Sequence, residues 1–187
     1  MRPMRDFDAQ PHLFDNIVRL RPMLPSDFDA LFAVASDREI WAIHPAHDRW
    51  QEPLFRTFFA DGLASGGALV IEDTATGAVI GSSRFDPSRS GPGEIEIEIG
   101  WTFLPRSHWG GVANRSVKRL MIGHALTAYD RVIFLVGEGN IRSRRALEKI
   151  GAVLTDRRHN VPLHGGIARH VIYAIDRARF AEGLLNS

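Results

Sequence analysis

Apolar and acidic residues alternate strictly in the stretch before Gly100. Three isoleucines fall on one face of an extended segment and three glutamates fall on the other: Ile95, Ile97 and Ile99 against Glu94, Glu96 and Glu98. A period of two predicts a strand with one face buried, here the isoleucine face, and it leaves the glutamates on the exposed face. Gly100 ends the alternation, and an extended pattern then continues as far as Leu104.

A helical pattern follows this strand, after Gly110 and Gly111. Its stripe recurs at i, i+3, i+4, i+7, i+8 and i+11 and consists of Val117, Leu120, Met121, His124, Ala125 and Ala128. This spacing predicts an amphipathic helix. A helix start presents unpaired N–H groups and a positive dipole end, and glycines let an anion approach the backbone. The turn therefore predicts a phosphate or pyrophosphate site, although such turns are more often plain connections.

The remaining periodic segments predict a mixed α/β fold. We expect strands at 17–21, 68–72, 78–82, 131–136 and 170–175, the fourth of them buried on both faces because it is almost continuously apolar. We expect helices at 26–35, 53–63, 140–150 and 178–185, with Ser26 and Asn140 as N-caps. No linker divides the pattern, so it predicts one domain over 17–187 after an irregular N-terminal arm at 1–16.

Composition narrows the class of protein. A length of 187 residues suits one domain with a real core, and a net charge of +1 without a basic stripe argues against nucleic-acid binding. The absence of cysteine excludes disulfides, thiolate metal sites and an acyl-cysteine intermediate. No stretch has the pattern of a signal peptide or of a membrane span, which favours a cytoplasmic location without membrane contact.

A group formed by His44, His47 and Asp48 is the one cluster that invites a metal site. Pro45 breaks the helical register that would bring both imidazoles to one ion, and no cysteine or HExxH motif accompanies them. The sequence therefore predicts no metal site.

Two motifs resemble the GNAT-type N-acetyltransferases, most closely the branch that includes the ribosomal-protein N-acetyltransferases. The first is W-x-x-x-x-N-x-x-x-K, formed by Trp109, Asn114 and Lys118, and the second runs from Asn140 to Gly151 as NIRSRRALEKIG. The resemblance covers about 17–180. It implies a mostly antiparallel sheet flanked by helices, in which the central strand splays away from its neighbour. It also implies acetyl-CoA as co-substrate, a primary amine on a protein N-terminus or small molecule as acceptor, and a monomer or homodimer.

The resemblance further implies where acetyl-CoA binds. Backbone groups beyond Gly100 would lie along the pantetheine, the amides of the glycine turn would face the pyrophosphate, and Asn140 would contact the pantetheine from the other side. The implied cofactor-binding residues are Trp101, Thr102, Phe103, Trp109, Gly110, Gly111, Val112, Ala113, Asn114, Lys118, Asn140 and Ser143. Where the branch often has Arg-Thr and Thr-Glu, this chain has Gly110-Gly111 and Arg115-Ser116. Arg115 and Arg119 either favour the phosphates or are solvated surface.

The catalytic candidates are Glu98 and Ser143. Glu98 is the acid nearest the splay, and it could take the amine proton directly or through water; its alternative is a solvated surface acid. Many GNAT enzymes have a tyrosine at the position of Leu147, and leucine cannot donate a proton. Ser143 could instead hydrogen-bond the leaving sulfur, or simply help to cap its own helix. Tyr173 is a weaker candidate.

Two functions follow from these residues. The first is an acetyl-CoA-dependent N-acetyltransferase. The alternative is a non-catalytic module of the same fold that binds an acyl-CoA as a signal, which the missing tyrosine favours. The segments 41–50 and 159–170 would form the walls of the acceptor site.

Overall fold

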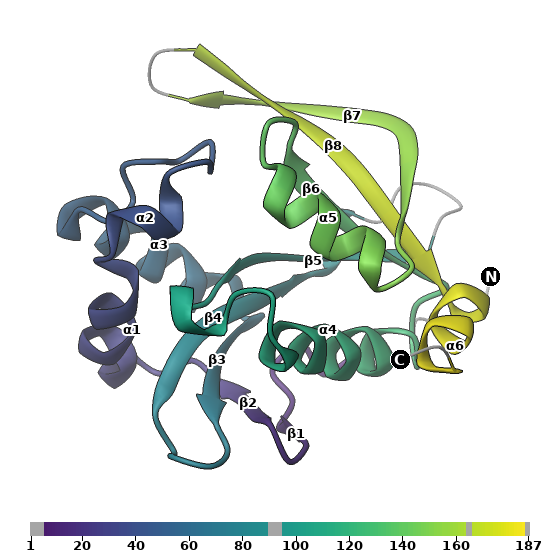
Figure 1. Ribbon diagram of the computed structural model, residues 1–187, viewed down its shortest axis with the longest axis horizontal. Helices are drawn as coiled ribbons and strands as arrows, with labels where there is room; N and C mark the ends of the chain where they lie inside the picture. Colours follow the sequence, from purple (N-terminus) through teal and green to yellow (C-terminus); the bar gives the residue numbers. More distant parts are fainter. Residues whose placement is uncertain (1–5, 90–94, 164–165, 186–187) are drawn as a thin grey trace.

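The computed structural model describes residues 6–89, 95–163 and 166–185, and in these residues a twisted eight-stranded sheet forms the centre of the molecule (Figure 1). The strand order is β1-β2-β3-β4-β5-β6-β8-β7, and every neighbouring pair is antiparallel except β5 and β6. The predicted class, a mixed and mostly antiparallel sheet flanked by helices, is confirmed. The strands are β1 (Leu13–Phe14), β2 (Val18–Pro22), β3 (Ala68–Asp73), β4 (Val79–Asp86), β5 (Glu96–Phe103), β6 (Arg131–Gly137), β7 (Val153–Leu163) and β8 (Gly166–Asp176). The α-helices are α1 (Phe28–Ala35), α2 (Arg38–Trp41), α3 (Glu52–Ser65), α4 (Val112–Ala125), α5 (Ile141–Lys149) and α6 (Arg177–Leu185).

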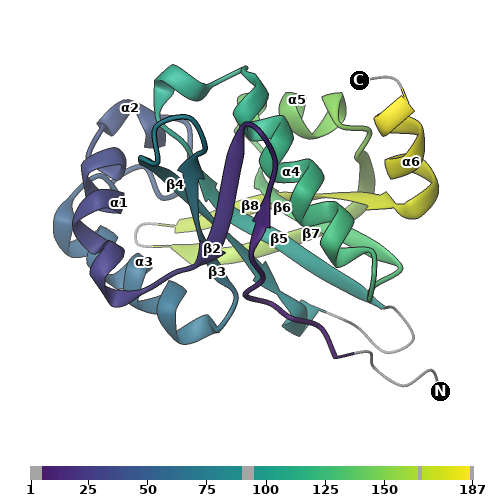
Figure 2. The same cartoon turned by 90° about the horizontal axis from the view of Figure 1, so that it is seen from below.

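Helices cover both faces of the sheet, and β3 shows this most clearly. Leu69 belongs to a core cluster with Met121 of α4, whereas the next residue, Val70, belongs to a second cluster with Phe55 of α3. Successive side chains of a strand point to opposite faces, so α4 packs on one side of β3 and α3 on the other (Figure 2). The second cluster is strongly aromatic, and Phe55, Phe58 and Phe59 of α3 belong to it.

The glutamate face of β5 is buried, and the expectation of a solvated face is wrong. Glu96 is 0% exposed and Glu98 is 3% exposed, whereas Ile95 is 38% exposed. The burial is possible because Glu96 is paired: the Arg157 guanidinium donates to its carboxylate at 2.7 and 3.0 Å, and Arg131 lies 3.2 Å away. Glu94 lies outside the described residues.

The predicted splay is present between β5 and β6. Their parallel pairing joins Glu96–Glu98 to Arg131–Ile133 and extends no further. On its other edge, β5 carries a bulge against β4, where the register shifts between the pairs Arg84↔Gly100 and Ser82↔Phe103. Trp101, inside the bulge, has φ of 54°, and no other described non-glycine residue has a positive φ. A bulge bends and twists its strand, which directs β5 away from β6.

The strand β7 was not predicted. It pairs with β8 in a long hairpin that extends beyond α5 (Figure 1). Its residues show no clear alternation of apolar and polar types, and the register shifts between Leu154 and Arg158. The periodic pattern that reveals a strand is therefore missing in the sequence.

Asp15 fastens the N-terminal arm to α4. Its carboxylate accepts hydrogen bonds from the backbone amide of Val18 and the hydroxyl of Ser116, and it forms an ion pair with Arg119 at 3.2 Å. The ring of Phe7 packs against the core near His124. The described part of the arm, 6–16, thus packs against the domain. Arg119 forms its ion pair with a carboxylate of this arm.

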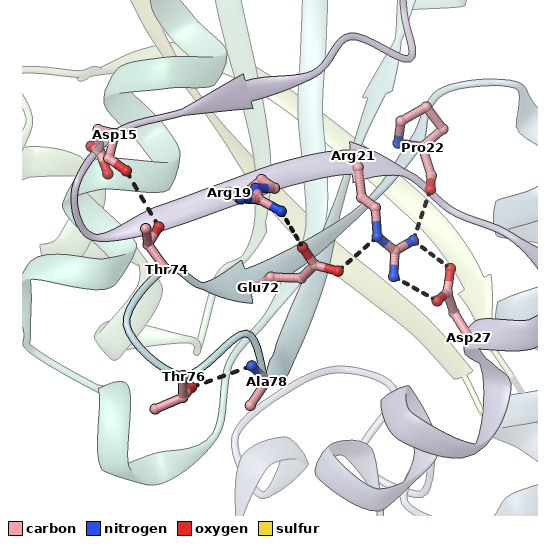
Figure 3. A network of polar contacts seen from close by, with 9 residues as sticks. All are labelled: Asp15, Arg19, Arg21, Pro22, Asp27, Glu72, Thr74, Thr76 and Ala78. Carbon is pink, nitrogen blue, oxygen red and sulfur yellow. Dashed lines mark hydrogen bonds and ion pairs between the residues drawn. The ribbon is translucent and has the colours of Figure 1, made fainter.

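A network around Arg21 fixes the start of the first helix (Figure 3). The guanidinium donates to both carboxylate oxygens of Asp27, at 2.8 and 2.9 Å, and to Glu72 at 2.7 Å. The Asp27 carboxylate also accepts a hydrogen bond from the amide of Leu24 at 2.7 Å. Asp27, rather than the predicted Ser26, therefore holds this helix start, because a 3-10 turn at Pro25–Asp27 precedes α1.

Candidate active site

A cleft of about 200 Å³ occupies the splay between β5 and β6. Its lining comes from the bulge of β5, the first two turns of α4, the divergent end of β6 and the start of α5. Most of the predicted site residues line it: Trp101, Thr102, Phe103, Trp109, Gly110, Asn114, Lys118, Asn140 and Ser143. Glu98, Gly111, Val112 and Ala113 do not line it. The structure thus brings nine of the predicted residues together around one cleft, and their roles in binding stay a prediction.

The N-terminus of α4 is open at one end of the cleft. Gly111 is the N-cap, so no side chain caps the helix, and the first turn contains no acid. By contrast, α1, α2 and α3 carry Asp29, Glu39 and Glu52 in their first turns. Gly110 has φ of 67°, a conformation that favours glycine, so the turn depends on this residue type. Unpaired amides and a positive dipole end make this helix start suitable for an anion.

Lys118 lies one and a half turns into α4 and points into the splay. Its ammonium donates to the hydroxyl of Thr102 at 2.8 Å and lies 5.3 Å from the ring centre of Phe134. The side chain is only 7% exposed, and burial lowers the pKa of Lys118 to about 8. The resemblance implied a lysine that contacts the cofactor, and the structure places it deep in the cleft, away from the helix start.

Asn140 caps α5, as predicted. Its side-chain oxygen accepts a hydrogen bond from the amide of Ser143 at 3.2 Å, and the residue is 5% exposed. The side-chain nitrogen of Asn140 (Nδ2) donates no hydrogen bond to any described residue, and Asn140 lines the cleft. Capping and ligand binding are therefore compatible at this residue, because they use different atoms.

Trp109 and Arg142 join the two sides of the cleft. The indole N–H of Trp109 donates to the carbonyl of Leu104 at 3.0 Å, and the guanidinium carbon of Arg142 lies 3.7 Å from the centre of the Trp109 ring. Arg142 also donates to the carbonyl of Ile40 at 3.1 Å. These contacts connect the start of α5 with α2 and with the loop before α4.

Glu98 lies next to the cleft but not on its wall. A Cβ atom at Gly100 would be 3.1 Å from a carboxylate oxygen of Glu98, and Gly100 itself lines the cleft. Glycine at this position thus leaves free the space beside the carboxylate that a side chain would occupy. The nearby Arg84 is 8% exposed; burial lowers the pKa of its guanidinium, while Asp61, Asp86 and Glu98 counteract that effect.

The structure removes Tyr173 from the candidates for a proton donor. Its side chain is fully buried, and its hydroxyl donates to Glu148 at 2.6 Å and accepts from Arg144 at 3.2 Å. The Tyr173 hydroxyl thus bridges Arg144 and Glu148. Leu147 lines the cleft at the position that the resemblance associates with the catalytic tyrosine.

Four further cationic or titratable side chains line the cleft and were not predicted as site residues: His44, His108, Arg142 and His170. His44 accepts a hydrogen bond from the amide of Ala46 on its Nδ1, and burial lowers its pKa to about 3. The only signal in the sequence was that His44 and His170 fall within or at the end of the expected acceptor walls. Their proximity depends on the fold of a loop and of β7–β8, which periodicity does not determine.

Solved structures with the same architecture are acetyltransferases. A GCN5-related N-acetyltransferase from Brucella melitensis is 21% identical with a TM-score of 0.76, covering 93% of this chain and 82% of its own. RimJ from Mycobacterium smegmatis, solved in complex with CoA-disulfide, is 19% identical with a TM-score of 0.71, covering 94% and 92%. An acetyltransferase of the GNAT family from Bacillus anthracis is 19% identical with a TM-score of 0.71, covering 89% and 98%. At these identities the likeness shows the fold.

The remaining comparisons address the family. No curated protein matches the chain. In the described residues, no helix is long and apolar enough to cross a membrane, and no group of three or more acidic or histidine side chains is arranged to hold a metal ion. A family model for the acetyltransferase (GNAT) domain matches residues 18–153, which is more than half of the sequence, and the chain therefore belongs to the GNAT acetyltransferase family.

Proposed function

We propose that this protein transfers an acetyl group from acetyl-CoA directly to a primary amine, either a protein N-terminus or a small-molecule amine. The observation that carries the proposal is the cleft in the splay between β5 and β6, whose lining includes Gly110 and Asn114, on either side of the uncapped start of α4. Family membership supports acyltransferase activity, and acetyl-CoA is the donor that the GNAT family uses.

The residues of the cleft suit coenzyme A in three places. The amides from Gly111 to Asn114 would hold the pyrophosphate, because no side chain caps them. Backbone groups of Trp101–Phe103 are not paired to β6 and would bind the pantetheine amides. The side-chain nitrogen of Asn140 would contact the same pantetheine arm from the opposite wall of the cleft. When bound, acetyl-CoA supplies the activated acyl group.

Glu98 is the proposed general base. A primary amine is protonated at neutral pH and must lose a proton before it can attack a thioester. The Glu98 carboxylate lies behind Gly100, so a single water in the cleft could relay this proton to it. Ile97 and Ile99, the neighbours of Glu98 on β5, pack in the cluster that includes α4. The Glu98 side chain therefore points to the opposite face of the sheet, which carries α3.

The test is a screen of amine acceptors with acetyl-CoA that detects free CoA, followed by the pH profile of kcat/KM for Glu98→Gln. The amide has the same shape but accepts no proton at neutral pH. We expect a loss of roughly 10²–10⁴-fold, typical of a positioned acid–base group, that shrinks as rising pH neutralises more of the amine. Glu52→Gln, at an exposed acid of α3, is the matched control and should behave as wild type.

The absence of a tyrosine at Leu147 favours the second function, an acyl-CoA sensor without turnover. Binding and turnover separate the two functions. Calorimetric binding of acetyl-CoA together with turnover of any amine supports the enzyme. Tight binding of acetyl-CoA without turnover of any amine in the screen would instead establish the sensor.

A further inference from the structure

Lys118 is a buried cation whose hydrogen-bonding capacity the protein does not fill. An ammonium has three N–H donors, and among the described residues only the Thr102 hydroxyl accepts from it, at 2.8 Å. The ring of Phe134 supplies a second stabilising contact to the charge, a cation–π interaction. Because Lys118 lines the cleft, its remaining donors are available to a ligand there.

No acid among the described residues pairs with this charge. The other titratable or cationic side chains that line the cleft are His44, His108, Arg142 and His170, from the loop after α2, the turn before α4, the start of α5 and β8. Of the two acids of β5, Glu96 pairs with Arg157, and Glu98 partly offsets the lowering of the pKa of Arg84 by burial. Burial is the only cause that lowers the pKa of Lys118, to about 8. The ammonium is therefore a stronger acid than an ordinary lysine side chain.

We propose that Lys118 protonates the thiolate of coenzyme A as it leaves, in place of the tyrosine that this chain lacks at Leu147. The proposal rests on the proposed function, because it assigns a role within the acetyl transfer. It makes Lys118 a catalytic residue at the sulfur, not a ligand of the pyrophosphate. The position supports this assignment: Thr102 and Phe134, which hold the ammonium, belong to the two strands that diverge, so Lys118 lies inside the splay.

The step balances in protons and electrons. The amine nitrogen forms a bond to the acetyl carbon, and the bond between that carbon and sulfur breaks with its electron pair on sulfur. Nζ of Lys118 gives one proton to the sulfur and becomes a neutral amine. Solvent then returns a proton to Nζ, while the proton lost by the attacking amine leaves through Glu98. A thiol has a pKa of about 8.5, so donor and acceptor are closely matched near neutral pH.

The alternatives are less suited to this step. The hydroxyl of Ser143 lines the cleft, but it is a far weaker acid than an ammonium with a pKa of about 8. The hydroxyl of Tyr173 is occupied by Glu148 and Arg144 and does not line the cleft. Of these three side chains, only Lys118 is both a sufficiently strong acid and placed in the splay.

The first test measures the bound thiol itself and needs no turnover. The thiolate absorbs ultraviolet light, so the pKa of the CoA thiol in the complex can be titrated against a complex with desulfo-CoA. We expect a thiol pKa at least one unit below that of free CoA in wild type, and a return to the free value in Lys118→Met. Methionine keeps the unbranched apolar stem but has no charge. An unchanged thiol pKa in Lys118→Met would overturn the proposal.

The second test separates charge from proton transfer. Lys118→Arg keeps the cation but cannot deprotonate, so it should retain the lowered thiol pKa and still lose turnover, by about tenfold or more. The loss of turnover in Lys118→Arg and in Lys118→Met should fade with acyl thioesters of more acidic thiols, because such leaving groups need no proton. Lys149→Met, at the exposed lysine of α5, is the control.

These outcomes are distinct from those of the proposed function. A protein that binds no CoA, or that acetylates no amine, refutes the proposed function. A protein that binds CoA and acetylates an amine, with Lys118→Met equal to wild type across the thioester series, refutes only the role of Lys118.

Discussion

The two helices that begin near the cleft, α4 and α5, differ in whether a side chain caps their first backbone amides. At α5 the side-chain oxygen of Asn140 caps the amide of Ser143, and Arg144 and Glu148 are joined through the hydroxyl of Tyr173. At α4 the N-cap is Gly111, with no side chain to accept from the first amides, and Lys118 is buried without an acid.

This difference shows which polar groups of the two helices lack a partner within the protein. The first-turn amide of Ser143 in α5 is capped by the side-chain oxygen of Asn140, so this cap stabilises the helix without any ligand. Helix α4 leaves its first amides and a buried ammonium to be satisfied by something else, and both deficits favour negative charge. An anionic ligand with a long arm would satisfy both at once. Stability and binding should therefore be opposed at α4 and separable at α5.

The largest expected effect is on the free energy of unfolding, which the buried charge of Lys118 lowers. Its folded-state pKa of about 8 lies below its unfolded value of 10.5, so between these pH values the unfolded chain binds more protons and stability rises with pH. Below pH 8 the full destabilisation applies. Lys118→Met should thus raise the free energy of unfolding at pH 7 by up to about 3 kcal/mol, a gain that disappears toward pH 10.5. Urea denaturation at several pH values measures it.

A control for this experiment is Lys149→Met, which removes an exposed charge from α5 and should change stability by less than about 0.5 kcal/mol at any of these pH values. If Lys118→Met were less stable than wild type at pH 7, the cation would be well solvated or paired, and the contrast between the two helices would fail.

The next effect is on the open start of α4. A Cβ at Gly111 would meet nothing closer than the carbonyl of His108 at 3.6 Å, so the fold tolerates a side chain there. Gly111→Asp should cap α4 and complement its dipole, raising stability by about 0.3–1 kcal/mol. The same carboxylate should repel the pyrophosphate and weaken CoA binding on the order of 30-fold. Thermal unfolding and calorimetry together check this opposition.

Gly111→Ser is the matched variant, since it caps without charge. We expect it to keep the stability gain and to lose less affinity than the aspartate variant. If Gly111→Asp binds CoA as tightly as wild type does, the start of α4 is not the phosphate site.

The sequence predicted the elements well where a single periodicity was uninterrupted. The stripe that includes Val117 and Met121 predicted α4, and the apolar run of β6 predicted a strand buried on both faces. The same reasoning was wrong about the glutamates of β5. Alternation reports the chemistry of the side chains, but burial of Glu96 depends on Arg157, sixty-one residues away, whose strand has no periodic signal.

The candidate site shows the same limit. The glycine turn and the cap Asn140 are local features, so the sequence revealed them together with the residues around them. The depth of Lys118 in the splay and the arrival of His44 and Arg142 at the cleft depend on how distant segments fold over the sheet. The role of a lysine one and a half turns into a helix follows only from which atoms surround its ammonium, and that information is tertiary.

The smallest expected effects lie at Asn140, where capping and binding use different atoms. Asn140→Asp keeps an oxygen for the amide of Ser143 and loses the amide nitrogen. We expect stability within about 0.5 kcal/mol of wild type, because aspartate and asparagine are equivalent caps, and CoA affinity lower by about tenfold, because the donor to the pantetheine is gone. Asn140→Ala should lose both the donor and the cap, with about 1 kcal/mol less stability. Calorimetry with CoA and urea denaturation of the two variants measure the separation. Equal CoA affinity in wild type and both variants would mean that Asn140 serves only the helix, and that α5 contributes a wall and no ligand contact at this position.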